Sequence, residues 1–405
     1  MESSRQSRIV QHGGPALRGF VRQRDYAQIV NERTVLTRVP FVDLGRAHAT
    51  LKATILDDVA AVIDIGAFLN GSHVIDFESA FARYCNSRHA IGVASGLDAL
   101  RLCLIAGGLE PGEEIILPAN TFIATAEAVT QARGTPVFVD VSELDYNLHP
   151  AAVAAGITQR TRFLLPVHLY GQLADMKSLR VLAKRDGPDI VEDACQAHGA
   201  TRDGNRAGAS GLAGAFSFYP TKNLGAMGDA GAVTTNDEVL AETVRALRQH
   251  GQRDKYVHEL EGFTSRLDTI QALVLCHKLP LLDAWNEQRR RAAAFYLGAL
   301  DGVGDLRLPP VAPGSNPVWH LFVLRTADPT GLAAFMRGRG IQTGRHYPTP
   351  VHLTPAYEHL GYTEGAFPVA ESLALECLSI PIFPGIQESE IAQVVEAIEG
   401  YFERG

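Results

Sequence analysis

The sequence predicts an α/β fold with a large domain built on a mostly parallel sheet and a smaller α+β domain at the C-terminus. Short aliphatic runs without polar alternation, as in strands buried on both faces, recur through the first half of the chain. Segments with helical spacing separate these runs, and this alternation is typical of a parallel sheet covered by helices on both faces. After residue 317, strand and helix patterns alternate over shorter distances, which indicates the smaller domain.

The predicted elements follow one another in a regular order. Buried strands are predicted at 90–94, 114–117, 136–139, 162–167 and 189–192. Helices are predicted between them at 98–107, 121–133 and 174–185. A long helical pattern covers 270–300, and a proline-rich loop follows at 308–317. Later strands are expected at 318–325, 341–346 and 378–382, and later helices at 329–338 and 387–403.

Three parts of the chain differ in composition and in predicted structure. Residues 1–37 hold six arginines and no lysine, and we expect a poorly ordered extension or an arm lying on a neighbouring subunit. Residues 38–270 are predicted to form the large domain, which binds the cofactor discussed below. Residues 271–405 are predicted to form a long linking helix and the small C-terminal domain.

Composition excludes several classes of function. The net charge of −8 and a pI near 6.0 argue against nonspecific nucleic-acid binding. The five cysteines are scattered without a CxxC pair, which fits a reducing compartment and argues against a disulfide framework or a metal site. No apolar run has membrane-spanning length and no signal peptide is evident, so we expect a cytoplasmic protein without a membrane partner.

Two residues point to pyridoxal 5'-phosphate (PLP) chemistry. Lys222 lies in a glycine-rich run of small residues at 217–231, and Asp193 closes the apolar run at 189–192. In PLP enzymes a lysine holds the cofactor as a Schiff base and later moves a proton. An aspartate keeps the pyridine nitrogen protonated, so that the ring can accept electrons. The pair together therefore predicts a PLP enzyme.

Other segments supply candidate cofactor contacts. The Gly96–Leu97 turn runs from a predicted strand into a helix, where free N–H groups and the helix dipole favour a phosphate. The Ser217 hydroxyl could donate to the same phosphate. Phe122 follows a predicted strand and could either stack on a flat ring or belong to the core. Cys195 invites interpretation as a nucleophile, but a small buried residue is the better interpretation.

The chain from Val39 to its C-terminus resembles the DegT/DnrJ/EryC1/StrS family of PLP-dependent nucleotide-sugar aminotransferases. The motifs are EDACQAHGA, FSFYPTKNLGAMGDAGAV and SRLDTIQA. The resemblance implies the fold of aspartate aminotransferase (fold type I) and a homodimer with shared active sites. It assigns the covalent link to Lys222, the ring nitrogen to Asp193 and the ring oxygen to Gln196. Phe122 would stack on the ring, and the phosphate would be held by Ser217, Gly96 and Leu97.

Finer motifs are similar to those of the branch that acts on dTDP-linked 3-keto-6-deoxyhexoses, which supplies amino sugars for antibiotics and surface glycans. These motifs are SGLDAL, NTFIAT, PVWHLFV and HYP. His346 and Tyr347 would then lie near the sugar nucleotide, whereas His320 is either a substrate contact or a core histidine. The family usually has asparagine where this chain has Thr264, and that asparagine contacts the cofactor phosphate of the other subunit.

The reaction expected from this resemblance transfers an amino group from L-glutamate to C3 of the ketosugar, giving a dTDP-3-amino sugar and 2-oxoglutarate. A 4-aminotransferase acting on a 4-keto sugar is an alternative, because the catalytic pair does not set the position. A dehydratase of the family would carry histidine in place of Lys222. A non-catalytic PLP-binding homologue is disfavoured by the intact set of cofactor residues.

Overall fold

Seven strands form one central sheet in the computed structural model, which describes residues 39–404. The predicted extension at 1–37 lies outside the described residues. The strand order is β1-β9-β8-β5-β4-β2-β3. Their bounds are β1 (His89–Val93), β2 (Glu114–Pro118), β3 (Thr135–Val139), β4 (Thr161–Leu164), β5 (Asp189–Asp193), β8 (Ala213–Ser217) and β9 (Gly231–Thr235). β9 pairs antiparallel with β1 and β8, and the other neighbouring pairs are parallel. The mostly parallel sheet is therefore confirmed.

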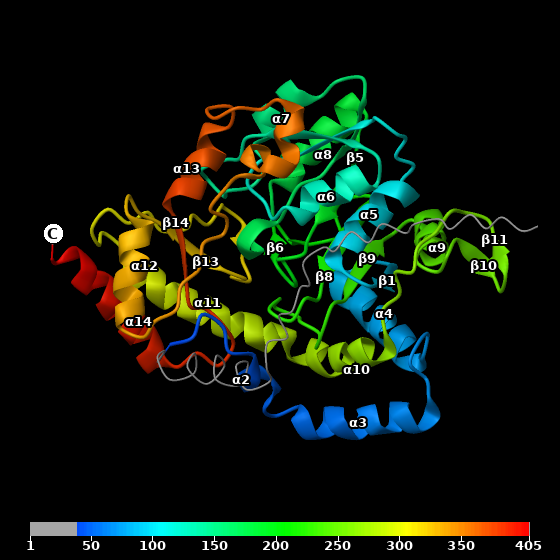
Figure 1. Ribbon diagram of the computed structural model, residues 1–405, viewed down its shortest axis with the longest axis horizontal. Coiled ribbons are helices and arrows are strands. Elements are labelled where there is room, and N and C mark those ends of the chain that lie inside the picture. Colours follow the sequence, from blue (N-terminus) through cyan, green and yellow to red (C-terminus); the bar gives the residue numbers. More distant parts are fainter. Residues whose placement is uncertain (1–38, 405) are drawn as a thin grey trace, which may run out of the picture. The chain divides into compact units, whose positions relative to one another are not determined.

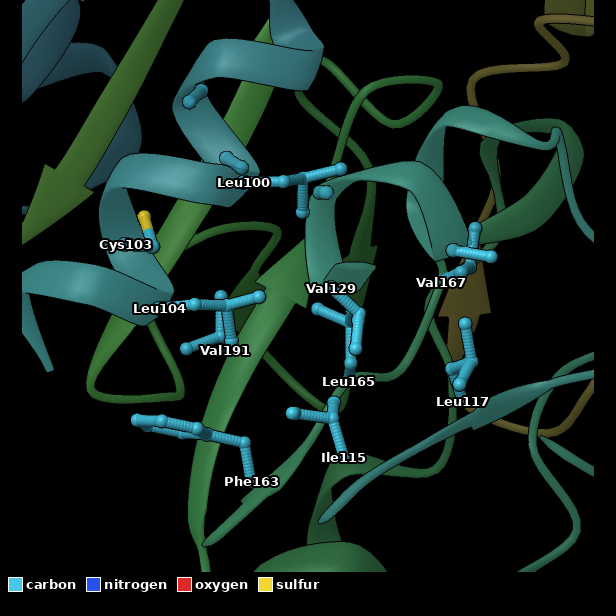
Figure 2. Packing of buried hydrophobic residues seen from close by; sticks show 14 of the residues in the cluster. Leu100, Cys103, Leu104, Ile115, Leu117, Val129, Phe163, Leu165, Val167 and Val191 are labelled. Atoms are coloured by element: carbon cyan, nitrogen blue, oxygen red, sulfur yellow. The ribbon is translucent and has the colours of Figure 1, made fainter. Parts of the chain in front are cut away.

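Helices cover both faces of this sheet (Figure 1). Those of the large domain are α4 (Ser72–Cys85), α5 (Gly96–Ala106), α6 (Ala124–Gln131), α7 (Pro150–Gly156), α8 (Met176–Asp186) and α9 (Glu238–Leu247). Side chains alternate along each strand, so Ile115 and Leu117 pack on the α5 face while Ile116 packs on the face that α7 and α8 cover. Figure 2 shows Leu100 and Leu104 of α5 within the first of these two clusters. Burial on both faces explains why the strand sequences lack polar alternation.

The C-terminal region begins with two helices where the sequence predicts one continuous helical pattern. α10 (Thr269–Lys278) and α11 (Leu282–Ala299) are joined by a 3₁₀ turn at Leu279–Leu281. Pro280 lies in that turn. Proline has no N–H to donate, and its ring clashes with the preceding helical turn. The expectation of one uninterrupted helix is thus wrong at this position.

The later elements mostly follow the predicted order. β13 (Phe322–Arg325) pairs antiparallel with β14 (Cys377–Ile380), and α12 (Pro329–Gly338), α13 (Pro368–Glu376) and α14 (Glu388–Phe402) pack nearby. The strand expected at 341–346 does not form. Only isolated bridges occur there among the described residues, from Ile341 to Val39 and from Gly344 to Ser379. Pro348 and Pro350 follow at once and cannot donate to a ladder.

Shorter elements complete the described chain. They are α2 (Leu44–His48), α3 (Lys52–Ile65), β6 (Thr201–Arg202), β7 (Asn205–Arg206), β10 (Gln252–Asp254), β11 (Val257–His258), β12 (Ser315–Asn316), and 3₁₀ turns at Leu169–Gly171, Val351–Leu353 and Pro355–Leu360. β12, inside the predicted loop at 308–317, pairs with β6. α3 runs along α10 in Figure 1, with Ile55 and Val62 packed on Leu273 and Val274. No helix within residues 39–404 is long and apolar enough to cross a membrane.

Candidate active site

A cavity of about 510 Å³ lies at the carboxyl ends of the parallel strands, where open α/β sheets bind their ligands. Ten of the eleven residues predicted from the sequence line it. They are Gly96, Leu97, Phe122, Asp193, Gln196, Ser217, Lys222, His320, His346 and Tyr347. The cavity has two sides, which we call the strand-end wall and the C-terminal wall. The strand-end wall comprises Gly96, Leu97, Phe122, Asp193, Gln196, Ser217 and Lys222, and the C-terminal wall comprises Arg289, His320, His346, Tyr347 and Ile382.

One end of the strand-end wall is the start of helix α5. Ser95 caps this helix, with its side chain accepting the N–H of Asp98 at 3.1 Å. A Cβ added at Gly96 would lie 2.6 Å from Cβ of Ser217 and 2.9 Å from Sγ of Cys195. Only glycine therefore lets the helix start approach the end of β8 this closely. The helix N-terminus and the Ser217 hydroxyl together form an arrangement suited to a phosphate.

Asp193 is the last residue of β5, and its buried carboxylate is held by neutral donors. Its Oδ1 accepts the N–H of Cys195 at 3.1 Å, and its Oδ2 accepts the Thr125 hydroxyl at 2.8 Å. Thr121 contacts Thr125 at 2.8 Å and extends this network. Because these partners are uncharged, the carboxylate can still pair with a cationic group in the cavity.

Glu192 precedes Asp193 in the chain but faces the other side of β5. Its carboxylate is fully buried and accepts the backbone N–H groups of Gly208, Ser210 and Gly211 at 2.7–2.9 Å. His168 contacts it at 2.8 Å. Burial alone would raise the pKa of Glu192, but these hydrogen bonds outweigh burial and lower it. These donors thus stabilise the charged form of Glu192, which does not line the cavity.

Lys222 lies in the turn after β8 and lines the cavity. Its backbone N–H donates to the carbonyl of Tyr219 at 2.8 Å. Burial lowers the pKa of its amine below the usual lysine value, while the nearby Cys195 and Asp193 act in the opposite direction. A lower pKa increases the neutral fraction of the amine, and the neutral form is the nucleophile and base.

Gln196 connects the two walls. Its Oε1 accepts the N–H of Tyr170 at 2.7 Å, and its Nε2 donates to the Tyr347 hydroxyl at 3.0 Å. The Tyr347 ring lies 5.7 Å from the ring of Phe122. Phe122 is 52% exposed, so the core alternative for this residue is wrong, and its face is open to the cavity.

The histidines of the C-terminal wall are held in the neutral form. Nδ1 of His346 lies 2.8 Å from the Ser379 hydroxyl, and Phe41 stacks on the imidazole at 5.6 Å. Burial, and next the charge of Lys222, lower the pKa of His346 to about 4. His320 contacts Oδ1 of Asn223 at 3.0 Å, and burial lowers its pKa well below the ordinary value. Both interpretations of His320 hold in part, since it is buried and also lines the cavity.

Arg289 of α11 is a cavity residue that the sequence reasoning missed. It is 3% exposed, and its Nη1 donates to the carbonyls of Trp319, His320 and Ile382 at 3.2, 3.3 and 2.7 Å. A usable signal was present in the sequence. Arg289 falls in register with the apolar face of α11, whose buried residues are Leu282, Trp285, Asn286, Arg289, Ala292, Ala293 and Tyr296. A charge on that face is unusual and indicates a specific role.

Three residues near the motifs lie apart from this set or act differently. Thr264 does not line the cavity; it is exposed, and its hydroxyl lies 3.2 Å from Nε2 of His250. His198 is fully buried against Phe216 and does not line the cavity either. Cys195 is half-buried and lines the cavity, but burial raises the pKa of its thiol well above the usual value, which argues against a nucleophile.

The cavity residues fit a PLP molecule. The amine of Lys222 and the carboxylate of Asp193 line the same space, as an aldehyde and a pyridine nitrogen on one ring require. The close approach at Gly96 places a helix N-terminus beside the Ser217 hydroxyl for the phosphate. The half-exposed Phe122 provides an aromatic face for the ring.

Comparison with known proteins agrees with this fit. A transaminase for dTDP-3-amino-3,4,6-trideoxy-α-D-glucose from Streptomyces venezuelae is 48% identical, over 93% of this chain and 99% of the relative. A dTDP-3-amino-3,6-dideoxy-α-D-galactopyranose transaminase from Aneurinibacillus thermoaerophilus is 41% identical, over 90% of this chain and 99% of the relative. The crystal structure of S. venezuelae DesV with a ketimine intermediate superposes with a TM-score of 0.89 and 49% identity, covering 91% of this chain and 100% of that one.

The match extends to a whole family and confirms the fold class and the kind of enzyme predicted from the sequence. Residues 49–399 match the profile of the DegT/DnrJ/EryC1/StrS aminotransferase family. This span includes both walls of the cavity, and the lining residues Phe41 and Val42 precede it. The chain therefore belongs to the DegT/DnrJ/EryC1/StrS aminotransferase family.

Proposed function

We propose that this protein transfers the amino group of L-glutamate to C3 of a dTDP-linked 3-keto-6-deoxyhexose, releasing 2-oxoglutarate and a dTDP-3-amino sugar. The observation that carries this proposal is a cavity in which Lys222 and Asp193 line the same space as His346 and Tyr347. Two relatives at 48% and 41% identity are named for dTDP-3-amino sugars, which supports the nucleotide and the position. The product would be a precursor for an antibiotic or a surface glycan.

PLP, when bound, supplies an aldehyde that takes up the amino group and a ring that spreads negative charge. We assign its covalent attachment to Lys222 and its ring nitrogen to Asp193. Asp193 is suited to this because a carboxylate beside the nitrogen keeps it protonated. Gly96, Leu97 and Ser217 would hold the phosphate, Gln196 would donate to the ring oxygen, and Phe122 would pack on the ring face.

Lys222 also moves the proton on which the reaction depends. Its amine takes the proton from the α-carbon of glutamate and, in the second half of the cycle, returns a proton to C3 of the sugar. Burial lowers its pKa, so that more of the amine is neutral and able to accept a proton. The same residue serves both halves because both substrates use one cavity in turn.

The C-terminal wall would select the sugar. His346 and Tyr347 present neutral groups that can hydrogen-bond hydroxyls without attracting an ion. His320 contributes from a deeper position. The choice of C3 over C4 depends on how these groups hold the hexose over the cofactor, since a small rotation of the sugar exchanges the two carbons.

The test combines purified holoenzyme, L-glutamate and a dTDP-3-keto-6-deoxyhexose, with 2-oxoglutarate as the readout. We expect 2-oxoglutarate in proportion to the aminosugar formed, and product NMR with nitrogen at C3. Nitrogen at C4, or turnover only with 4-keto sugars, would establish the 4-aminotransferase alternative. No turnover with either sugar in a protein that retains PLP would support the non-catalytic homologue.

We further propose that the protein acts as a homodimer. Helix α3 buries Ile55 and Val62 against α10 but exposes Leu56, Ile63 and Ile65 at 56%, 58% and 78%. Exposed apolar faces of this kind are typical of interaction surfaces. Under this proposal Thr264 supplies a hydroxyl to the cofactor phosphate of the partner subunit.

Sedimentation of Ile63→Asp tests the dimer. We expect a shift toward monomer with loss of activity, because a charge is placed on the apolar face of α3. Leu375→Asp is the matched control, since Leu375 is an equally apolar residue that is 70% exposed on α13. A wild-type protein that sediments as a fully active monomer would refute the proposal.

Two further predictions from the sequence remain proposals. We retain the division into a large domain at 38–270 and a C-terminal region at 271–405, which limited proteolysis near residue 270 can test. We also retain a cytoplasmic location, supported by scattered cysteines that are free in the described chain.

A further inference from the structure

Lys278 is a buried lysine at the end of helix α10 that does not line the cavity. It is 3% exposed, and burial lowers the pKa of its amine to about 8 with no offsetting acidic group among residues 39–404. The amine therefore stays mostly protonated at neutral pH. A buried ammonium without a carboxylate is costly unless its N–H groups have other partners, so those partners indicate its role.

The partners of Lys278 are neutral and come from three parts of the chain. Its Nζ donates to the carbonyl of Gly225, in the turn that carries Lys222. Nζ also lies 3.1 Å from Nε2 of His48 in α2 and 5.8 Å from the ring centre of Trp285 in α11. Burial, and next the charge of Lys278, lower the pKa of His48, so its neutral imidazole can accept from the ammonium. Figure 1 shows α2 beside the junction of α10 and α11, where these groups meet.

Gly225 lies where the lysine turn closes on itself. The N–H of the next residue, Ala226, donates to the carbonyl of Phe218 at 2.7 Å. A Cβ added at Gly225 would overlap the carbonyl oxygen of Pro220, so the end of the turn packs directly on its beginning. Such a closed turn moves as a unit. Displacing the Gly225 carbonyl would therefore displace Lys222, which lies three residues earlier.

Two other polar side chains of α10 and α11 hold the same turn. Oε1 of Gln271 accepts the N–H of Met227 at 2.9 Å, and Oδ1 of Asn286 accepts the side-chain amide of Asn223 at 2.8 Å. Lys278 lies between them along the two helices and is the charged member of the three. Hydrogen bonds from an ionised donor are about twice as strong as neutral ones, so Lys278 should be the strongest of these anchors.

We propose that the His48–Lys278 pair positions the amine of Lys222 for attachment to the cofactor and for proton transfer. This inference rests on the assignment of both tasks to Lys222 in the proposed function. Lys278 is a positioning residue, because it acts on the amine through the Gly225 carbonyl and does not reach the cavity. Since one amine serves both half-reactions, loss of the pair should slow both by the same factor and leave substrate binding unchanged.

Single-turnover mixing of holoenzyme with L-glutamate, and separately of the aminated enzyme with ketosugar, tests this inference. Lys278→Met has a similar size and no charge. We expect both rate constants to fall about 10- to 150-fold, the factor for a lost hydrogen bond from a charged donor. Both half-saturating concentrations should stay within about threefold of wild type, since binding is not affected. Unchanged rates, or a loss confined to one half-reaction, would overturn the inference.

Two further variants separate positioning from general destabilisation. His48→Leu keeps the buried lysine and removes its acceptor, so both rate constants should fall by a smaller factor, about 2- to 10-fold. Unchanged rates in this variant would contradict the role of the pair. Val274→Ala is the control, because Val274 is buried on the face of α10 that packs on α3. It should lower the free energy of unfolding through a cavity yet leave both rates within about threefold of wild type. An equal slowing by Val274→Ala would overturn the inference.

Attachment of PLP to the apoprotein distinguishes this inference from the proposed function. Absorbance follows the attachment, and borohydride with peptide mapping locates it. We expect the label on Lys222 in both proteins and an attachment rate at least about tenfold lower in Lys278→Met. His48→Leu, with a smaller decrease, supplies the same measurement if Lys278→Met does not fold. These results would support the inference even if no ketosugar is aminated.

The contrary outcomes are distinct. Equal attachment rates in wild type and both variants would overturn the inference and leave Lys222 as the attachment site. Label on a different lysine of the wild-type protein would overturn the assignment of Lys222 and, with it, the inference.

Discussion

The two walls of the cavity differ in how they are built and in what charges they carry. The strand-end wall comes from the ends of β5 and β8, the turns that follow β2, β5 and β8, and the start of α5. The C-terminal wall comes from loops at 319–321, 345–348 and 381–383 and one helical arginine. The first wall carries the lysine and the carboxylate, whereas burial keeps the histidines of the second neutral. Under the proposed function, reaction chemistry and substrate recognition thus occupy different kinds of structure.

This difference follows from what each task demands. Cofactor chemistry needs groups fixed to within a fraction of an ångström, which regular elements with buried neighbours provide. Recognition of a sugar needs side chains whose identity can vary, and loops tolerate such variation. The comparison predicts that substitutions in the strand-end wall damage both half-reactions, while those in the C-terminal wall damage one.

Lys222→Ala should have the largest effect. Losing both the covalent attachment and the proton carrier should reduce turnover at least about 1,000-fold in both half-reactions, with the fold preserved. Turnover and circular dichroism measure this, and Lys184→Ala, an exposed lysine on α8, is the control. Borohydride should fix the cofactor onto the peptide that contains Lys222. Label on a different lysine would remove the assignment.

Asp193→Asn should have the next largest effect. A neutral amide of the same size cannot keep the ring nitrogen protonated, so turnover should fall about 10- to 1,000-fold, which one to three pKa units represent. The Thr125 hydroxyl can still donate to the amide oxygen, and the local structure should persist. Thr125→Ser, which keeps the hydroxyl donor, serves as the control. Near-normal rates in Asp193→Asn would contradict the role of the charged strand-end wall.

Tyr347→Phe probes the point where the walls meet. It removes the hydrogen bond from Gln196 but keeps the ring beside Phe122. We expect the half-saturating ketosugar concentration to rise about 2- to 10-fold, the effect of one neutral hydrogen bond. The first half-reaction should change less. A larger rise in the half-saturating concentration of glutamate than in that of ketosugar would show that Tyr347 acts with the strand-end wall.

The pH dependence of stability should show the smallest effect. The pKa of His346 falls from 6.5 to about 4 on folding, so the unfolded chain takes up a proton that the folded chain refuses. The unfolding free energy is therefore unaffected by His346 above pH 6.5 and decreases as pH falls from 6.5 toward 4. Urea unfolding at pH 7 and pH 5 should show a weaker dependence in His346→Gln. The exposed His359→Gln variant should behave as wild type.

Much of the strand-end wall could be predicted because its chemistry lies in short continuous motifs. Asp193 closes a recognisable apolar run and Lys222 lies in a glycine-rich turn, and the topology of a parallel sheet brings such strand ends and turns together. The five strands predicted between residues 90 and 192 all form. The 3₁₀ turn at Pro280 and the absence of a strand at 341–346 were not predicted, although the prolines are visible in the sequence, because helical spacing continues across Pro280 and because Pro348 and Pro350 lie just beyond the expected strand.

The C-terminal wall was harder to predict because tertiary contacts define it. Arg289, Arg290 and Arg291 are consecutive in the sequence, and only the helical register of the apolar residues around them distinguishes the first. Phe41 lies in the cavity through its stacking on His346, a residue 305 positions away. No local pattern encodes such a contact. His346 and Tyr347 were found through the family resemblance rather than through their own spacing.

The buried cluster around Glu192 has a consequence for the register that β5 adopts during folding. Adjacent residues of a strand face opposite sides, so a shift of β5 by one residue would exchange Glu192 with Asp193. The three N–H groups that surround Glu192 suit its longer side chain and leave Asp193 for the cavity. A misaligned strand would bury one carboxylate without these donors, at a cost of several kcal/mol. The neighbouring acidic pair thus favours the native register of β5, because the shifted register is higher in free energy even without a cofactor.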